Sequence, residues 1–130
     1  MGKEEGLKGE YHFIADLNSH GIPYTYKDTW YDFDVLGQKV EVKSCQITNE
    51  NSKKKEKYTI GRFDFTNEEN RERQYEEDIW VCFILRHKEE HLNLGLAKAR
   101  KLNKKRYISL HKLRTIKPIT LKQFIRKHQG

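Results

Sequence analysis

Apolar residues in the first third of the chain follow two different spacings, one helical and one extended. Between Leu7 and Leu17 they recur every three or four positions, which predicts an amphipathic helix over residues 6–19. Over residues 31–43 apolar and polar residues alternate instead, which is typical of strands with one buried face. We predict two short strands there, joined by a tight turn at Gly37-Gln38.

The rest of the chain adds further elements in an order that indicates the fold class. A continuous apolar run over residues 78–85 has the length of a buried central strand. Residues 66–75 predict a short, almost wholly polar helix, which we expect to be exposed or to face a partner. Residues 49–57 predict a loop because none of them is apolar. Thr120 can cap a terminal helix. The order predicts an α/β fold, a mixed β-sheet flanked by helices, in a single domain over residues 1–130.

Charge is distributed unevenly along the 130 residues, whose net charge is +7. Residues 98–130 contain twelve of the 26 Lys and Arg residues and none of the 19 Asp and Glu residues. The first 97 residues therefore carry a net charge of −5. A basic C-terminal third favours binding to a polyanion such as nucleic acid, and a solubilising tail is the alternative.

The predicted hairpin over residues 31–43 concentrates charge on one face. With a two-residue turn at Gly37-Gln38, Asp34 lies opposite Glu41 and Asp32 lies opposite Lys43. Carboxylates that face each other on a sheet repel unless a cation compensates. Oxygen ligands at this density suit Mg²⁺ or Mn²⁺. The alternative is a solvated hairpin face with incidental charges.

Asp32, followed after a short turn by Glu41-Val42-Lys43, resembles the signature of the PD-(D/E)xK nuclease superfamily. The form of the motif is similar to that of Holliday-junction resolvases and restriction-type endonucleases. Tyr31 stands where the motif has its proline, and the resemblance covers mainly residues 6–48. It implies a restriction-endonuclease-like core, in which a meander of strands precedes a crossover helix and a further strand.

The resemblance also implies an activity, a Mg²⁺-dependent (or Mn²⁺-dependent) DNA endonuclease that hydrolyses phosphodiester bonds. The implied catalytic residues are Asp32, Glu41 and Lys43. The implied metal ligands are Asp32, Glu41 and the backbone carbonyl of Val42, with Asp34 as the alternative to Asp32. Glu10 matches a glutamate on the first helix that reaches the metal in several branches, so it is a further ligand candidate. The alternative for Glu10 is a favourable charge near the start of a helix.

Basic residues outside the motif are the candidates for contacts with DNA phosphates. They are Lys53, Lys54, Lys55, Arg62, Lys98, Arg100, Lys101, Lys104, Lys105 and Arg106. Because one active site contacts one scissile phosphate, an enzyme of this size that cuts both strands is expected to be a homodimer. The alternative function is a non-catalytic, basic nucleic-acid-binding domain.

Other features exclude competing classes. No apolar run approaches membrane-spanning length and no signal-peptide pattern opens the chain, so we expect a cytoplasmic (intracellular) protein without a membrane partner. Cys45 and Cys82 fall inside predicted strands, which predicts buried thiols without a disulfide. The six histidines are scattered, and no glycine-rich phosphate loop or Ser-His-Asp order is present.

Overall fold

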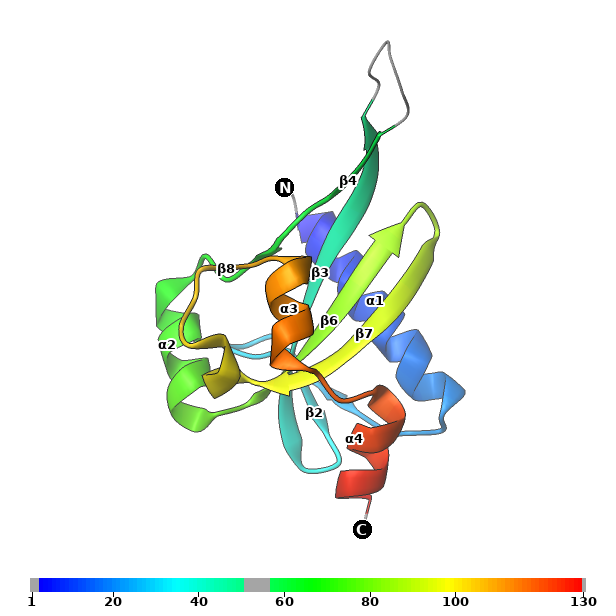
Figure 1. The fold of residues 1–130 in the computed structure, drawn as a ribbon. Helices are drawn as coiled ribbons and strands as arrows, with labels where there is room; N and C mark the ends of the chain where they lie inside the picture. Colours follow the sequence, from blue (N-terminus) through cyan, green and yellow to red (C-terminus); the bar gives the residue numbers. More distant parts are fainter. Residues whose placement is uncertain (1–2, 51–56, 130) are drawn as a thin grey trace.

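The computed structural model describes residues 3–50 and 57–129, and the side-chain environments of residues 7–47 and 61–129. The described chain is a mixed α/β fold, with a six-stranded mixed sheet and helices on both of its faces (Figure 1). The predicted mixed sheet flanked by helices is confirmed. In chain order the elements are α1 (Lys3–Ser19), β1 (Thr25–Tyr26), β2 (Phe33–Val35), β3 (Gln38–Glu50), β4 (Lys57–Ile60), β5 (Phe63–Asp64), α2 (Glu68–Glu77), β6 (Trp80–His87), β7 (Glu90–Lys98), the 3₁₀ turn η1 (Ala99–Leu102), β8 (Tyr107–Ile108), α3 (Leu110–Ile116) and α4 (Leu121–His128).

The long strand β3 organises the sheet. The strand order is β1-β2-β3-β6-β7, and β4 pairs with the far end of β3. β3 and β6 run parallel, and the other neighbouring pairs are antiparallel. The connection from β3 to β6 passes through α2, as a parallel pair requires a crossover. The apolar run predicted as a central buried strand is β6, whose first five residues are all buried.

The turn of the β2–β3 hairpin lies one residue earlier than predicted, so each strand residue pairs two positions away from its predicted partner. Phe33 pairs with Val40, so the two-residue loop is Leu36-Gly37 and not Gly37-Gln38. Leu36 and Gly37 have φ values of 51° and 77°. A type I′ turn needs positive φ at both central positions, and its twist matches that of the flanking strands. The glycine therefore occupies the second loop position rather than the first.

This register changes the charge pairs of the hairpin. Asp34 lies opposite Lys39, so an attractive pair replaces the repulsive pair that the predicted register would create with Glu41. Continuing the register past the end of β2 places Asp32 opposite Glu41. The predicted pairings of Asp34 with Glu41 and of Asp32 with Lys43 are therefore wrong.

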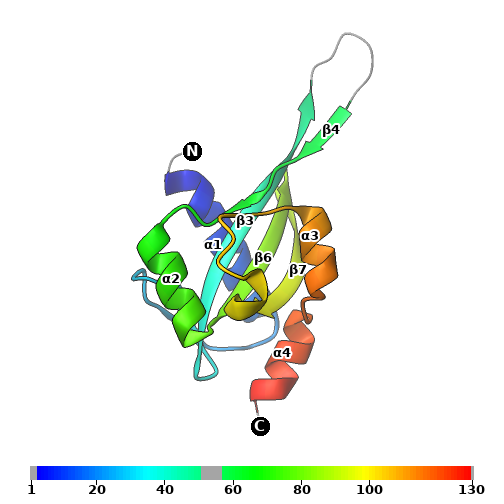
Figure 2. The ribbon, with the colours of Figure 1, turned by 60° about the vertical axis from the view of Figure 1, so that its left-hand side comes forward.

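Two apolar cores lie on opposite faces of the sheet. Phe13 of α1 and Phe124 of α4 belong to one core, and Phe63 of β5 and Leu113 of α3 belong to the other. Figure 2 shows α1 behind the sheet and α2 and α3 in front of it. No described residue of α2 belongs to either core. Polar contacts must therefore hold α2 in place, and these contacts border the candidate site.

Several smaller predictions can be compared with the structure. Cys45 and Cys82 are buried and free, as predicted. The segment expected to be a loop contains strand residues at both of its ends, because β3 extends to Glu50 and β4 begins at Lys57. Thr120 caps α4 with a complete capping box, which confirms that prediction. Among the helices of the described residues, none is long and apolar enough to cross a membrane.

Candidate active site

The backbone of β3 continues past the end of β2, and Asp32 occupies the edge that becomes free there. The Asp32 N–H donates to the Val40 carbonyl at 3.1 Å. The Asp32 carboxylate accepts a hydrogen bond from the Val42 N–H at 2.7 Å. Because the N–H and C=O of one strand residue point to the same edge, the Val42 carbonyl also faces this side. The hairpin register thus brings one carboxylate and one backbone carbonyl to the same edge.

Glu41 adds a second carboxylate beside Asp32. It is only 8% exposed, and it lies close enough to Asp32 and Gln74 for both to influence the pKa of its carboxyl group. The Lys43 ammonium lies 3.4 Å from the Glu41 carboxylate and 5.0 Å from the centre of the Phe65 ring. Two acids and one ammonium therefore meet in a site that water reaches poorly, where charges interact more strongly than in bulk water.

Helix α1 brings a third carboxyl group to the edge. Gly9 allows this approach, because a Cβ at that position would lie 2.7 Å from the Ser44 Oγ of β3. The next residue, Glu10, shares a hydrogen bond with Asp32 and accepts one from the Tyr26 hydroxyl at 3.0 Å. The glutamate singled out from the sequence therefore lies next to Asp32.

The three carboxyl groups titrate well above their ordinary range. Burial, followed by the charge of Asp32, raises the pKa of Glu10 to about 7. Burial, followed by the charge of Glu41, raises the pKa of Asp32 to about 8. Burial also raises the pKa of Glu41, although the charge of Lys43 opposes this shift. Near neutral pH the site therefore holds protons unless a cation replaces them.

Gln74 is a site residue that sequence reasoning missed. Its side chain is 3% exposed, and its amide nitrogen donates to the Trp30 carbonyl at 2.8 Å. Gln74 also lines the same small cavity as Glu41, and it counters the rise in the pKa of that carboxyl group. The prediction that α2 is an exposed or partner-facing helix is therefore wrong for its inner face. The sequence pattern that could have indicated Gln74 is the helical spacing of Asn67, Asn70 and Gln74. These polar residues occupy the positions at which a helix normally carries its apolar stripe.

Asp34, the alternative ligand, lies apart from this group. Its carboxylate accepts a hydrogen bond from the Tyr31 hydroxyl at 2.8 Å and lies 3.7 Å from the Lys27 ammonium. Neither Glu10 nor Glu41 is among these partners. Asp34 thus has donors of its own, and Asp32 is the aspartate that borders the other carboxyl groups.

The donor set suits a hard divalent cation. No group of three or more His, Cys, Asp or Glu side chains in residues 3–50 and 57–129 is arranged to hold a metal ion. Two adjacent carboxylates, from Asp32 and Glu41, and the Val42 carbonyl nevertheless face one edge, and all are oxygen donors. Oxygen donors are those that Mg²⁺ and Mn²⁺ prefer. Burial is the main cause of the raised pKa values of Asp32 and Glu41, and a bound cation would favour their ionised forms.

The predicted DNA-contacting residues are spread over a wider surface. Lys53, Lys54 and Lys55 lie outside the described residues. The Arg62 guanidinium stacks 3.6 Å from the centre of the Tyr107 ring, and that of Arg106 lies 5.3 Å from the same ring. Both arginines are exposed, and each directly precedes a strand of the small β5–β8 sheet.

The remaining candidates lie on or near η1, and three of them have partners within the chain. The Lys98 ammonium donates to the Asp78 carbonyl at 3.0 Å. Arg100 donates to the last carbonyls of α2 at 3.1 and 3.3 Å, and so caps that helix. The Lys104 ammonium lies 3.0 Å from the Glu72 carboxylate. Lys101 and Lys105 are exposed.

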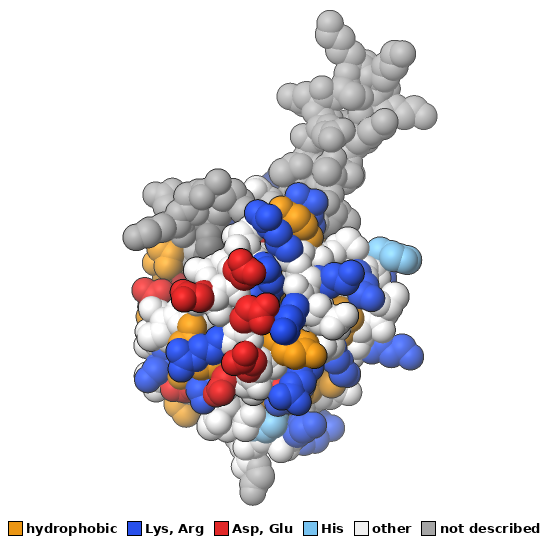
Figure 3. Space-filling view, turned by 90° about the vertical axis from the view of Figure 1, so that its left-hand side faces the viewer, with side chains coloured by type: hydrophobic (Ala, Val, Ile, Leu, Met, Phe, Trp, Pro, Cys, Tyr) orange, Lys and Arg blue, Asp and Glu red, His pale blue; other side chains and the backbone are white. Residues whose placement is uncertain are grey.

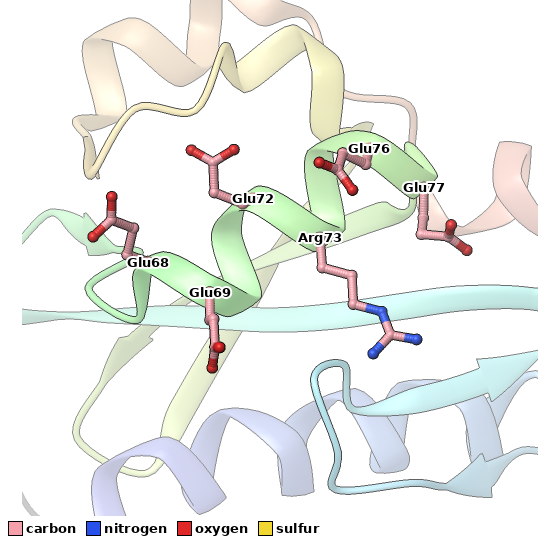
Figure 4. A pocket seen from close by; sticks show the side chains of 6 residues that line it. All are labelled: Glu68, Glu69, Glu72, Arg73, Glu76 and Glu77. Atoms are coloured by element: carbon pink, nitrogen blue, oxygen red, sulfur yellow. The ribbon is translucent and has the colours of Figure 1, made fainter.

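The outer side of α2 is strongly acidic. Acidic side chains gather on the face of the molecule on which α2 lies (Figure 3). They border a surface hollow of about 510 Å³ whose lining is Glu68, Glu69, Glu72, Arg73, Glu76 and Glu77 (Figure 4). This outer surface repels a polyanion.

Comparisons with protein-family models, with curated proteins and with solved structures found no match for this chain. A functional assignment therefore rests on the residues and their geometry. The features that carry it are the buried carboxyl group of Glu41, the half-buried carboxyl groups of Glu10 and Asp32, and the ammonium group of Lys43.

Proposed function

We propose that the protein is a Mg²⁺-dependent DNA endonuclease with a PD-(D/E)xK-type active site. One observation carries the proposal. The hairpin register places Asp32 beside Glu41, within reach of Lys43, while Asp34 is held elsewhere by Tyr31. A merely structural hairpin gains nothing from two adjacent carboxyl groups with little exposure to water, because their mutual repulsion is destabilising.

The order of elements supports the same proposal. Helix α1 precedes the antiparallel strands β1, β2 and β3, and α2 then crosses over to β6, which lies parallel to β3. A meander followed by a crossover helix and a further strand is the arrangement that the resemblance implies. We propose that these elements form a restriction-endonuclease-like core.

The chain's own residues have separate roles in this proposal. Asp32, Glu41 and the Val42 carbonyl hold the cation, and Glu10 holds Asp32 or water beside it. When bound, the cation supplies positive charge for the phosphate and lowers the pKa of water. The Lys43 ammonium orients the attacking water and offsets the negative charge that develops on the phosphoryl oxygens. Gln74 positions Glu41 through its amide.

Nicking of supercoiled plasmid DNA in the presence of Mg²⁺ tests this assignment. We expect Asp32→Asn, Glu41→Gln and Lys43→Ala each to lower the nicking rate at least about a hundredfold. Asp34→Asn is the matched control, because it makes the same chemical change two residues away, and it should keep most of the activity. Loss of activity in Asp34→Asn with retention in Asp32→Asn would reverse the assignment.

The alternative function is a non-catalytic nucleic-acid-binding domain. The exposed Arg62 and Arg106, stacked on Tyr107, favour it because such stacks can contact both phosphates and bases. Binding of DNA by the wild-type protein without any Mg²⁺- or Mn²⁺-dependent nicking would support this alternative and contradict the nuclease proposal.

Cleavage of both strands would require two active sites, so we propose that the protein acts on duplex DNA as a homodimer. Light-scattering mass measurements on the free protein and on a Ca²⁺-containing DNA complex test this proposal. A monomeric mass in both states, together with double-strand cleavage, would contradict it.

A further inference from the structure

A small cavity lies between β3 and the inner side of α2. Its volume is about 30 Å³, and its lining includes Glu41 and Lys43 of the candidate site together with Asn70 and Arg71 of α2. A cavity needs about 10–15 Å³ of such volume for each water molecule. The space therefore admits one or two oxygen atoms and is too small for a nucleobase.

The Arg71 guanidinium has one hydrogen bond within the chain and one buried donor without a partner among the described residues. One Nη atom of its guanidinium donates to the Phe65 carbonyl. Its Nε is buried and has no hydrogen-bond partner among the described residues. An unpaired donor in a buried position is costly, and it usually indicates a missing partner. The Nε edge of a guanidinium is the edge that binds two oxygens of a phosphate or carboxylate at once.

The charges around the cavity indicate which oxygen-bearing group fits. Lys43 and Arg71 supply two cations, and Asn70 adds a neutral amide. Glu41 is also in the lining, so a second carboxylate placed there would add to the repulsion within the site. A phosphodiester is anionic, presents two nonbridging oxygens, and would be bound by the same cation as Glu41.

We propose that this cavity is a phosphate subsite, in which Arg71 and Lys43 bind nonbridging oxygens of a nucleic-acid phosphodiester. The inference rests on the proposed nuclease function and adds a substrate-binding residue on α2 to it. It also explains why the inner side of α2 is polar although it packs against the sheet. An apolar stripe there would bury more surface but would leave the phosphate without a donor.

The same helix provides a matched control. Arg73 lies two residues further on, is exposed, and stacks 4.4 Å from the centre of the Trp30 ring. Figure 4 shows its side chain on the outer side of α2, pointing the same way as Glu69. Replacing Arg73 removes an equal charge from α2 without changing the cavity.

Two measurements test the subsite, and only one depends on catalysis. In the Mg²⁺ nicking assay, Arg71→Met should lower kcat/KM on the order of a hundredfold, Arg71→Lys should lose less, and Arg73→Met should stay within about twofold of wild type. In NMR spectra of the wild-type protein, the Arg71 Nε–H resonance should shift saturably as inorganic phosphate is added. The Arg73 resonance should not shift in this way.

The outcomes separate this inference from the proposed function. An unshifted Arg71 resonance, or wild-type kinetics in a folded Arg71→Met variant, overturns the subsite even if the protein cuts DNA. A saturable Arg71 shift in a protein that never nicks DNA supports the subsite and contradicts the nuclease. If Arg71→Met fails to fold, as judged by circular dichroism, the Arg71→Lys variant and the wild-type titration still decide.

Discussion

Two acidic residues on the same helix, α1, lie in opposite environments. Asp16 has one carboxylate oxygen 2.8 Å from the His91 Nε2, and its other oxygen accepts a hydrogen bond from the Asn93 amide at 3.1 Å. Glu10, less than two turns away, accepts a hydrogen bond from Tyr26 but also borders Asp32, and its pKa is raised to about 7.

The difference between them distinguishes an anchor from a binding group. Asp16 is satisfied by donors from β7, so its contacts hold α1 against the sheet. Glu10 meets another acid, and the chain supplies too little positive charge to keep both ionised. An acid of the first kind contributes to stability, whereas an acid of the second kind is suited to bind a cation from outside the chain.

Replacing each acid by its amide should give the largest difference in activity between the Glu10 and Asp16 positions. Glu10→Gln should lower Mg²⁺-dependent nicking about 10–100-fold, because it removes a negative charge beside Asp32. Asp16→Asn makes the same chemical change and should leave nicking within about twofold of wild type. Equal losses in both variants, measured well below their unfolding temperatures, would show that Glu10 is also only an anchor.

The pH dependence of stability should sharpen the comparison. The pKa values of Glu10 and Asp32 rise on folding from 4.5 and 3.8 to about 7 and about 8. The folded state thus binds protons that the unfolded state releases. The resulting stability is complete below the unfolded pKa values and is lost as the pH rises through 7 and 8.

Urea unfolding between pH 4 and pH 9 measures this loss, and Asp32→Asn should remove most of it. At pH 8, Mg²⁺ should restore stability by about 2.7 kcal/mol at a concentration one hundred times its Kd. Parallel stability curves for wild type and Asp32→Asn would contradict the assigned shift.

Truncating the anchor should cost stability. Asp16→Ala leaves His91 and Asn93 without their acceptor and should lower the free energy of unfolding by about 2 kcal/mol. The change should appear as a lower urea midpoint with the same slope. Glu10→Ala should cost less at pH 8, because it also removes a repulsion. A larger loss from Glu10→Ala than from Asp16→Ala would contradict the comparison.

Substitutions at the contact between α1 and β3 should have the smallest effect on the free energy of unfolding. Gly9→Ala places a Cβ against Ser44 and should cost about 1 kcal/mol, since the gain in helix propensity partly offsets the steric conflict. Ser44→Gly alone should also cost stability, but the double variant should lose less than the sum of the two. Strict additivity, measured by urea unfolding, would show that α1 does not pack closely there.

The candidate site was largely predictable because its motif is local. Asp32, Glu41 and Lys43 are close in sequence, and alternation along two strands is enough to bring them to one region. The turn was misplaced by one residue, and the strand pairing therefore by two, because Gly37 can occupy either loop position. The type I′ geometry and the attraction between Asp34 and Lys39 select between them.

Residues contributed by distant elements were not predictable in the same way. Gln74 reaches Glu41 only because α2 crosses over the sheet, and no local pattern encodes that contact. Helix α3 was missed because Tyr107 and Ile108 indicate a strand and the helix buries only Leu113 and Ile116. Ser109 could have indicated the start of this helix, because serine is a preferred N-cap residue. In the structure its hydroxyl accepts a hydrogen bond from the Lys112 N–H.

The length of β3 sets a fixed reach for the molecule. From Glu41 to the end of the strand at Glu50 the extended backbone spans about 30 Å, at about 3.3 Å per residue. One turn of B-form DNA measures about 34 Å. For a duplex lying along β3, the carboxylate edge and the far end of the strand would meet the same side of the helix one turn apart. Under the proposed nuclease function, shortening the strand by two residues would then be expected to shift the footprint on DNA without altering the chemistry of the cut.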